Sequence, residues 1–406
     1  MKILLTIAWR NIWRNRGRSG ALLSAIIVGL WAGVLTVGLM SGVVQQRMDY
    51  MIESEITHLQ LHHQDFRAER RPELVVENFR EILNWLEERE EVKSHTARTL
   101  AEGMLQSPVK TSGVRIMGVN PETEQKTTTF HENLTEGEYL DADLRNPVFI
   151  GQSLAREHRM ELGDRVVLTF ERVDGELSSA AFNIAGIFRS GSTQYDDAHI
   201  FVKSTDLSEL MSDEKIIHEI AVMLRDESLA ENITKELNEQ FGPTEALTWD
   251  QLSPELGTLA LLGGFMLFLV TMVIMIALAF GILNTMLMAL FERIREIGML
   301  ISIGMSRFRV FIMVVLEAIV ITLIGSMIGI LLAWVTMLTL GKSGVNLELF
   351  AGGIEEIGWP TVIYPSITTE EFILIVIIVV VMTVLASLYP AWKAFKVNPM
   401  EIEKDT

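Results

Sequence analysis

The sequence predicts a membrane α-helical fold with four transmembrane helices and a large α+β extracytoplasmic domain between the first and second helix. Three observations support this fold class. Of the 406 residues 49% are hydrophobic, and the mean hydropathy of +0.30 is high for a soluble domain. The chain contains four long apolar runs, and most of its acidic residues lie between the first two of these runs.

The four runs have the length that membrane crossing requires, because a spanning helix needs roughly 20 mostly apolar residues. We place the spans at residues 19–46, 256–291, 310–341 and 372–392, and the first includes an outer stalk. A signal peptide has an apolar region of only about 7 to 15 residues, so we interpret the first run as a permanent anchor. The second run would be about 54 Å long as a helix, which predicts that part of it projects from the bilayer.

Basic residues near the spans predict the orientation of the chain. Residues 1–18, 292–309 and 393–406 together hold twelve Lys or Arg and five Asp or Glu. We therefore expect both termini and the link after the second span to be cytoplasmic; the family resemblance described below implies that the membrane is a bacterial inner membrane. In residues 1–18, Trp9 and Trp13 lie beside Arg10 and Arg14, which is typical of a helix in the membrane interface.

The segment between the first two spans has the opposite charge. Residues 45–257 hold 21 Lys or Arg and 41 Asp or Glu, a net charge of -20, and we expect them outside the cell membrane. Nucleic acid requires a basic face, so we expect no nucleic-acid partner.

Residues 47–255 have the pattern of an α+β domain. Alternation predicts strands at Ser54–His62 and Ile216–Leu224, and helical spacing predicts helices at Pro72–Val92 and Asp226–Phe241, so that two strand-helix units share one small sheet. Residues 112–212 are predicted to form an inserted β-rich subdomain. Its strands are Val114–Val119, Val148–Gly151, Arg165–Glu171, Phe182–Phe188 and His199–Lys203. Residues 342–371, between the last two spans, are too few for a domain.

Common motifs of catalysis and metal binding are missing from the sequence. There is no cysteine, and the P-loop ending Gly341-Lys342-Ser343 has Thr336 where its first glycine belongs. His131-Glu132 lacks the second histidine of a zinc protease, and we interpret His62-His63 as a solvated strand end. We therefore expect no catalysis, no metal site and no cofactor in this chain.

Two features of the apolar half point to function. The link at residues 292–309 begins as an amphipathic helix, and Gly304 permits a turn. Such a helix can transmit force from a partner, or it can simply lie on the lipid surface with its arginines near anionic headgroups. Glu317 is an ionisable residue inside the third span, and such residues are costly enough to be functional candidates. It lies two turns from Arg309, so the alternatives are a structural pair with an arginine, a bond to a neighbouring helix, and a role in transport.

Five segments carry a family resemblance that covers essentially the whole chain. They are AWRNIWRNRGRS at residues 8–19, IGQSLAREHRMELGDRVVL at 150–168, FNIAGIFRSGSTQYDDAHIFV at 182–202, ERIREIGMLISIGMSRFRVFIMVVLEAIVITLIG at 292–325, and SLYPAWKAFKVNPMEI at 387–402. These segments resemble the FtsX/MacB/Lol-type permeases of ABC transporters, and most closely the lipoprotein-releasing permeases.

The resemblance implies a MacB-like periplasmic core domain and a function in mechanotransmission. It implies that the link forms a coupling helix that docks on a cytoplasmic ABC ATPase dimer, which binds the ATP, and that a second permease, identical or paralogous, completes the complex. Lipoproteins, or similar amphipathic cargo, would be lifted from the membrane lipid and handed to a periplasmic carrier. The implied docking residues are Glu292, Arg293, Arg295, Glu296, Gly298 and Gly304.

Carrier recruitment in that group of permeases uses a protruding hairpin. The candidate here is short and polar, with Asp174-Gly175 as its turn. It comprises Val173, Asp174, Gly175, Glu176 and Leu177. Three alternatives stay open: an FtsX-like signalling subunit that activates a cell-wall hydrolase, a MacB-like exporter of other amphipathic cargo, and a membrane-anchored enzyme.

Overall fold

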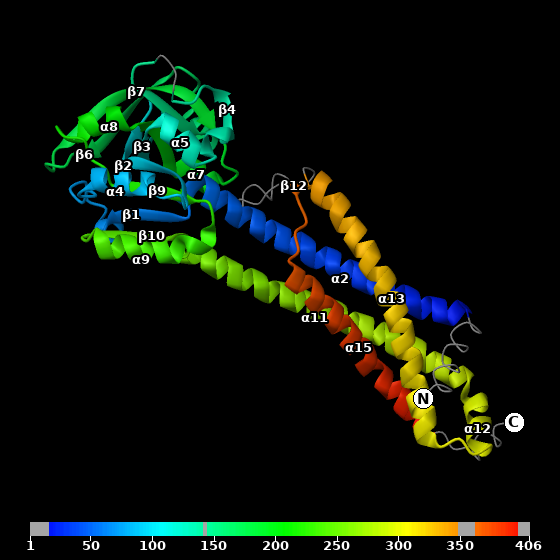
Figure 1. Ribbon diagram of the computed structural model, residues 1–406. Helices are drawn as coiled ribbons and strands as arrows, with labels where there is room; N and C mark the ends of the chain where they lie inside the picture. The colour runs from blue at the N-terminus through cyan, green and yellow to red at the C-terminus, as the bar shows by residue number, and fades with distance from the viewer. Residues whose placement is uncertain (1–15, 141–143, 348–361, 397–406) are drawn as a thin grey trace. The chain divides into compact units, whose positions relative to one another are not determined.

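The computed structural model describes residues 16–140, 144–347 and 362–396 (Figure 1). Most of the predicted interfacial helix at residues 1–18, most of the tail at 393–406 and the middle of the link at 342–371 lie outside the described residues. The chain divides into two compact units. Of the described residues, the helical unit comprises 16–45, 260–346 and 362–396, and the α+β unit comprises 46–140, 144–259 and 347.

Four helices of the described chain are long and apolar enough to cross a membrane, which makes this a multi-pass membrane protein. They are α2 (Arg16–Met51), α11 (Pro254–Glu292), α13 (Arg307–Ser343) and α15 (Thr369–Phe395). At a rise of 1.5 Å per residue, the 36 residues of α2 and the 39 of α11 correspond to about 54 and 58 Å. Both helices are therefore longer than the hydrocarbon core of a bilayer, which is about 30 Å thick.

All four long helices contribute to one hydrophobic core in the helical unit. Ile26 and Leu30 of α2 are fully buried in this core and pack on α13. The same two helices are joined by a polar contact, because Trp31 Nε1 donates a hydrogen bond of 3.0 Å to Thr336 Oγ1. A hydrogen bond between apolar helices fixes their register as well as their distance.

The connection between α13 and α15 lies directly against α2. Strand β11 (Val345–Asn346) pairs antiparallel with β12 (Val362–Ile363), and Ser366 N–H donates to the carbonyl of Gly38 at 2.9 Å. One turn further along α2, a Cβ on Gly42 would overlap the carbonyl oxygen of Tyr364. The two glycines form a GxxxG spacing, which permits close approach of another backbone. In this chain the approaching backbone is the chain's own.

The α+β unit contains a ten-stranded sheet path in the order β10-β1-β9-β2-β3-β8-β5-β7-β4, with β6 paired to β2 and β7. The long strand β2 pairs with β9 through its first half and with β3 and β6 through its second half. The strands are β1 (Leu59–His63), β2 (Val92–Gln106), β3 (Thr111–Val119), β4 (Leu134–Gly137), β5 (Pro147–Gly151), β6 (Arg165–Glu171), β7 (Leu177–Phe188), β8 (His199–Lys203), β9 (Glu219–Leu224) and β10 (Thr244–Thr248).

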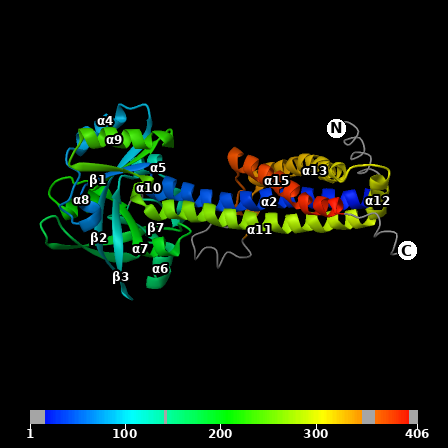
Figure 2. The ribbon, with the colours of Figure 1, turned by 90° about the horizontal axis from the view of Figure 1, so that it is seen from below.

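Short helices cover this sheet. Helices α4 and α9 lie side by side (Figure 2) and share one hydrophobic cluster with β1 and β9. Arg89 beside α4 pairs with Glu236 of α9 at 2.8 Å. The short helices of this unit are α3 (Phe66–Glu69), α4 (Phe79–Glu87), α5 (Pro121–Thr127), α6 (Gln152–His158), α7 (Thr193–Ala198), α8 (Ser204–Met211), α9 (Ala230–Gln240) and α10 (Trp249–Leu252). The unit also contains the π-helix η1 (Ile52–Ile56) and the 3-10 helices η2 (Phe130–Asn133) and η3 (Glu227–Leu229).

The structure confirms the predicted strands Arg165–Glu171 and His199–Lys203 and corrects other elements. Ser54–Ile56 is not a strand, because the chain stays helical after α2 through the π-helix η1 and leaves it at Thr57, whose φ is 65°. Only Phe79–Glu87 of the helix predicted at Pro72–Val92 forms, starting after Asn78 in the left-handed region. The β-rich middle does not form a separate sheet, since β2 connects it to β9.

A buried ion network lies where the two halves of β2 meet. Arg98 is 1% exposed, and its guanidinium binds Glu124 of α5 at 2.6 Å and Glu219 of β9 at 2.5 Å. Burial of three charged groups is tolerated because each charge has an opposite partner and hydrogen bonds. The carboxylates hold the pKa of Arg98 above its usual range despite the opposing effect of desolvation, so the arginine is charged.

His62 corrects the prediction of a solvated strand end, because its side chain is buried and its ring stacks on Phe66. Burial lowers the pKa of His62. Its neighbour His218 is also buried, with Nε2 3.0 Å from the carbonyl of Pro72 and Nδ1 3.1 Å from the N–H of Leu100. Desolvation lowers the pKa of His218 to about 4, so both rings are neutral parts of the core at neutral pH.

Candidate functional site

The link between α11 and α13 contains a separate short helix. Helix α11 ends at Glu292, Arg293 precedes α12 (Ile294–Ser302), and α13 begins at Arg307. The turn after α12 depends on Gly304, whose φ of 104° is one that side chains with a Cβ rarely adopt. This predicted turn residue therefore has a backbone role that only glycine fills without strain.

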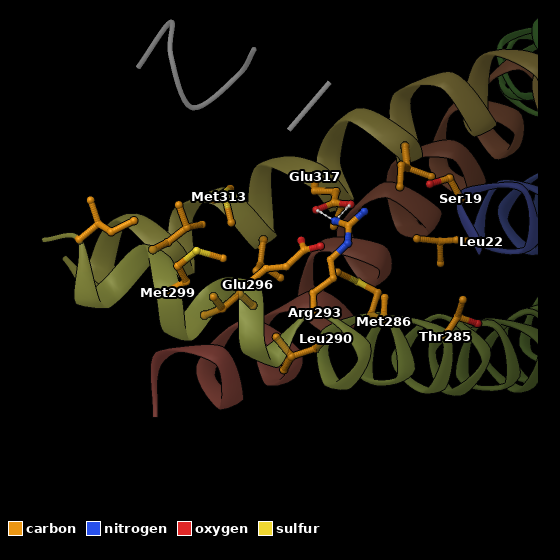
Figure 3. A pocket seen from close by; sticks show the side chains of 17 residues that line it. Ser19, Leu22, Thr285, Met286, Leu290, Arg293, Glu296, Met299, Met313 and Glu317 are labelled. Atoms are coloured by element: carbon orange, nitrogen blue, oxygen red, sulfur yellow. Dashed lines mark hydrogen bonds and ion pairs between the residues drawn. The ribbon is translucent and has the colours of Figure 1, made fainter. Parts of the chain in front are cut away.

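Arg293 and Glu317 connect this link to the first third of α13. Arg293 Nη1 lies 3.1 Å and 3.3 Å from the two carboxylate oxygens of Glu317 (Figure 3). The two side chains are only 12% and 19% exposed. A charge in such apolar surroundings is costly without a partner, so each residue fixes the position of the other. Glu317 thus pairs with an arginine that comes from the link itself.

A cavity of about 490 Å³ opens beside this ion pair. Its walls come from α2, α11, α12 and α13, and they are mainly apolar (Figure 3). Three methionines from three different helices line it, Met286, Met299 and Met313, and so do the charged side chains of Arg293, Glu296 and Glu317. The arrangement combines a flexible apolar wall with a small charged cluster, which is the composition of a ligand pocket.

The six residues implied as an ATPase-docking set do not share one surface. Glu292, Arg295 and Glu296 are exposed, whereas Arg293 is turned toward Glu317 and Gly298 is buried. Gly304 lies in the turn. Glu292, Arg295 and Glu296 lie at the surface of the link, while the other three residues shape and anchor it. Docking itself stays a prediction.

Exposed apolar side chains accompany the charged ones on this link. Met299 is 60%, Ile303 78% and Phe308 63% exposed. Large apolar groups gathered on one exposed segment mark a surface for lipid or for a protein partner.

The predicted carrier hairpin lies in the α+β unit as the connection of β6 and β7, which pair antiparallel up to Glu171 and Leu177. Asp174 accepts hydrogen bonds from Arg172 Nε and from the N–H of Glu176, and Gly175 has a φ of 83°. These bonds lower the pKa of Asp174. The N–H of Val173 donates to Met211 at the end of α8, so the turn is tethered at its base, and Leu177 is 77% exposed. Carrier binding there stays a prediction.

The methionine wall of the cavity was not visible in the sequence. Met286, Met299 and Met313 stand in separate apolar helical stretches, and each fits a side chain that faces lipid or core. Only the relative placement of α11, α12 and α13 brings them together. The sequence did indicate an ion pair, because an acidic residue inside a membrane span is costly unless it has a partner.

Comparison with known proteins gives matches over nearly the whole chain. Residues 19–240 match the family described as MacB-like periplasmic core domain, and residues 265–399 match the family described as FtsX-like permease C-terminal. The chain is 21% identical to the lipoprotein-releasing system transmembrane protein LolC of Buchnera aphidicola, over 93% of this chain and 91% of that protein. It is also 21% identical to the corresponding protein LolE of Haemophilus influenzae, over 94% and 93% of the two chains.

A solved structure, the periplasmic region of MacB from Actinobacillus actinomycetemcomitans, matches with a TM-score of 0.36 and 14% identity, covering 52% of this chain and 98% of that one. The family assignment rests on the sequence matches, of which the first alone spans more than half of the 406 residues. This chain therefore belongs to the FtsX-like, MacB-type permeases of ABC transporters, which are non-catalytic transmembrane subunits and imply a partner ATPase.

Proposed function

We propose that this permease transmits mechanical work from its ATPase to the α+β unit through α12 and the ion pair between Arg293 and Glu317. The ion pair is the observation that carries the proposal. A force applied to α12 reaches α13 through a charged contact that is mostly shielded from water, where electrostatic interactions are stronger than at a surface. The exposed Glu292, Arg295 and Glu296 are the proposed docking residues.

The proposal requires α12 to be cytoplasmic and the α+β unit to be on the other side of the membrane. The basic segments around the spans support this orientation. The chain has no cysteine, so single cysteines report their own location without background. In intact cells, Leu177→Cys should react with a membrane-impermeant maleimide, and Arg295→Cys should react only after permeabilisation of the inner membrane. The reverse pattern would overturn the orientation and the docking together.

The proposed task is the release of lipoproteins from the inner membrane to a periplasmic carrier. Relatives named for lipoprotein release match more than nine tenths of the chain, which supports this task. A second permease, identical or paralogous, and a carrier that docks at Val173–Leu177 belong to the same proposal.

Reconstitution with the partner ATPase in proteoliposomes tests the task. We expect ATP-dependent release of a lipoprotein, lost in Arg293→Ala and kept in Lys342→Ala, an exposed charge at the far end of α13. Activation of a cell-wall hydrolase without release would instead support a signalling subunit. Export of another amphiphile without release would support an exporter.

A further inference from the structure

The α+β unit is joined to two of the long helices by two connections that are built differently. The first runs from α2 through the π-helix η1 into β1, and the second runs from β10 through α10 into α11. Both can be followed inside the α+β unit, which includes the last residues of α2 and the first residues of α11. Their construction indicates which of the two can change its angle when a helix moves.

The first connection is held by several hydrogen bonds. The carbonyl of Glu53 accepts from the N–H of Thr129 at 3.0 Å, and the hydroxyl oxygens of Ser54 and Thr129 lie 2.9 Å apart. Thr57, which follows η1, is fully buried with a φ of 65° and a ψ of 177°, a combination that is essentially limited to glycine. A β-branched residue persists there only where the surrounding contacts determine its conformation. The first connection is therefore rigid.

The second connection is interrupted by a proline. Pro254 is the first residue of α11, and a proline disfavours the helical conformation in the residue before it. Ser253 accordingly has a φ of -129° and a ψ of 81°, so α10 does not continue into α11. A single non-helical residue separates the two helices, which makes Ser253 the place where α11 can pivot.

The guanidinium of Arg67 fastens the end of α10 next to this pivot. Its Nη2 donates to the carbonyl of Leu252 at 2.6 Å, and its Nη1 donates to the carbonyl of Gln251 at 3.3 Å. The last carbonyls of a helix have no partner within the helix, and an arginine is a suitable donor for them. Arg67 belongs to α3, which is anchored because Phe66 is buried and stacks on His62 of β1. Arg67 thus ties the second connection to the strand that the first connection enters.

A cavity of about 410 Å³ is lined by both connections. Glu55 and Ile56 of the first connection face it, as do Leu252 and Ser253 of the second, together with Arg67. Side chains in a protein interior are close-packed and resist displacement. The space beside the end of α10 is not filled in this way, so α10 has room to move once the two bonds of Arg67 open.

We propose that Arg67 is a latch that sets the angle of α11 at Ser253, while the segment around Thr57 holds the end of α2 rigidly to the sheet. The latch is the weaker of the two fastenings, because Arg67 is exposed and water competes for the same carbonyls. With the latch closed, movement of α11 is passed to the α+β unit. With the latch open, α11 pivots and the movement is lost. The inference rests on the proposed function for its role in coupling, but the latch itself can be measured on the permease alone.

Distances between pairs of spin labels on the full chain test the latch. The chain has no cysteine, so labels on introduced cysteines are the only ones present. Glu231→Cys on α9 and Thr258→Cys on α11 place one pair across the pivot, and both positions are exposed. We expect Arg67→Ala to widen the distance distribution of this pair at least about twofold, since two charge-assisted hydrogen bonds are lost. A distribution as narrow as that of the wild type would overturn the latch.

A second pair of labels and a second substitution are the controls. Glu231→Cys with Glu53→Cys reports on η1, and its distribution should stay narrow in Arg67→Ala because the first connection does not depend on the latch. Arg71→Ala removes another exposed arginine, which pairs with acidic side chains of its own segment, and should leave both distributions unchanged. Widening of both pairs in Arg67→Ala would show a general loosening of the unit and contradict the latch.

Removal of the proline tests the pivot. In the background of Arg67→Ala, the additional substitution Pro254→Ala lets a helix run through Ser253, and we expect it to narrow the distribution across the pivot again. This rescue distinguishes a pivot from general damage, because a second substitution would not repair a poorly folded unit. Failure of Pro254→Ala to narrow the distribution would overturn Ser253 as the pivot.

The role in coupling is measured with the partner ATPase present. We expect Arg67→Ala to lower the amount of lipoprotein released per ATP hydrolysed, while Arg71→Ala keeps the wild-type ratio. An unchanged ratio in Arg67→Ala, together with a widened distribution across the pivot, would overturn the role of the latch in coupling. Absence of release by the wild type would instead contradict the proposed task, and the spin-label result does not depend on it.

Discussion

Arg98 on β2 and Glu219 on β9 form an ion pair of 2.5 Å with side chains that are 1% and 7% exposed. Together with Glu124, they connect α5, β2 and β9 at the point where the two halves of the sheet meet. An uncompensated charge at this depth is more damaging than the loss of the pair itself, because it has neither water nor a partner.

We predict that Arg98→Leu lowers the free energy of unfolding of the α+β unit by about 3–5 kcal/mol, since it leaves two buried carboxylates without their arginine. Thermal unfolding of the detergent-solubilised protein measures the change. The control is Arg89→Leu, which breaks the exposed pair with Glu236 and should cost less than about 1 kcal/mol. Equal effects of the two substitutions would contradict a central role for the network.

Acid should destabilise the α+β unit through His218. An unfolded histidine titrates near pH 6.5, but the pKa of His218 is lowered to about 4, so between these values the unfolded chain binds more protons. The contribution of neutral His218 to the free energy of unfolding is therefore fully present above about pH 6.5. It is lost as the pH drops toward 4, by up to about 3 kcal/mol. His218→Gln removes the titration, and its unfolding temperature should fall less between pH 7.5 and 5 than that of the wild type. An identical fall would rule out His218 as the cause.

The ion pair of the link predicts a specific pattern of rescue. Arg293→Glu and Glu317→Arg should each reduce stability and the proposed lipoprotein release, because each places two like charges side by side. The double variant restores opposite charges, and we expect a coupling energy of about 0.5–3 kcal/mol from the double-mutant cycle. Additive losses without rescue would show that the two residues act independently.

Replacing glycine with alanine should lower the stability of the protein at Gly304 but not at Gly281. Gly304→Ala forces a Cβ into a φ of 104° and should cost about 1–3 kcal/mol. Gly281→Ala, on an exposed face of α11 with open space around it, should be neutral or stabilise the helix by up to about 1 kcal/mol. The unfolding temperatures of the two variants are measured in the same detergent and compared with that of the wild type. An unchanged unfolding temperature for Gly304→Ala would show that the turn can relax.

The membrane half of the fold was predictable because a bilayer imposes a length and an absence of charge on each span. Glu317 stood out against that background, and its need for a partner followed from the same physics. The identity of the partner did not follow, since Arg307 and Arg309 are much nearer to Glu317 in the sequence than Arg293, which lies 24 residues away and is brought close only by the fold. The cavity was likewise out of reach, because its walls meet only in three dimensions.

The α+β unit was harder to predict, and β2 shows why. Its sequence, VKSHTARTLAEGMLQ, has no clean alternation, because Thr96, Arg98 and Thr99 are polar and yet buried. Their polar atoms are satisfied by residues far away in the sequence, such as Glu219. A strand of this kind is stabilised by tertiary partners, which local patterning does not reveal.

The contact of the Tyr364–Ser366 backbone with Gly38 and Gly42 has a mechanical consequence. With the loop before α15 bonded to α2, and Trp31 bonded to Thr336 of α13, three of the four long helices are cross-braced near one end. Helix α11 is the least buried of the four. If force reaches α12 as proposed, it would therefore act on a braced frame of α2, α13 and α15 and on the less buried helix α11.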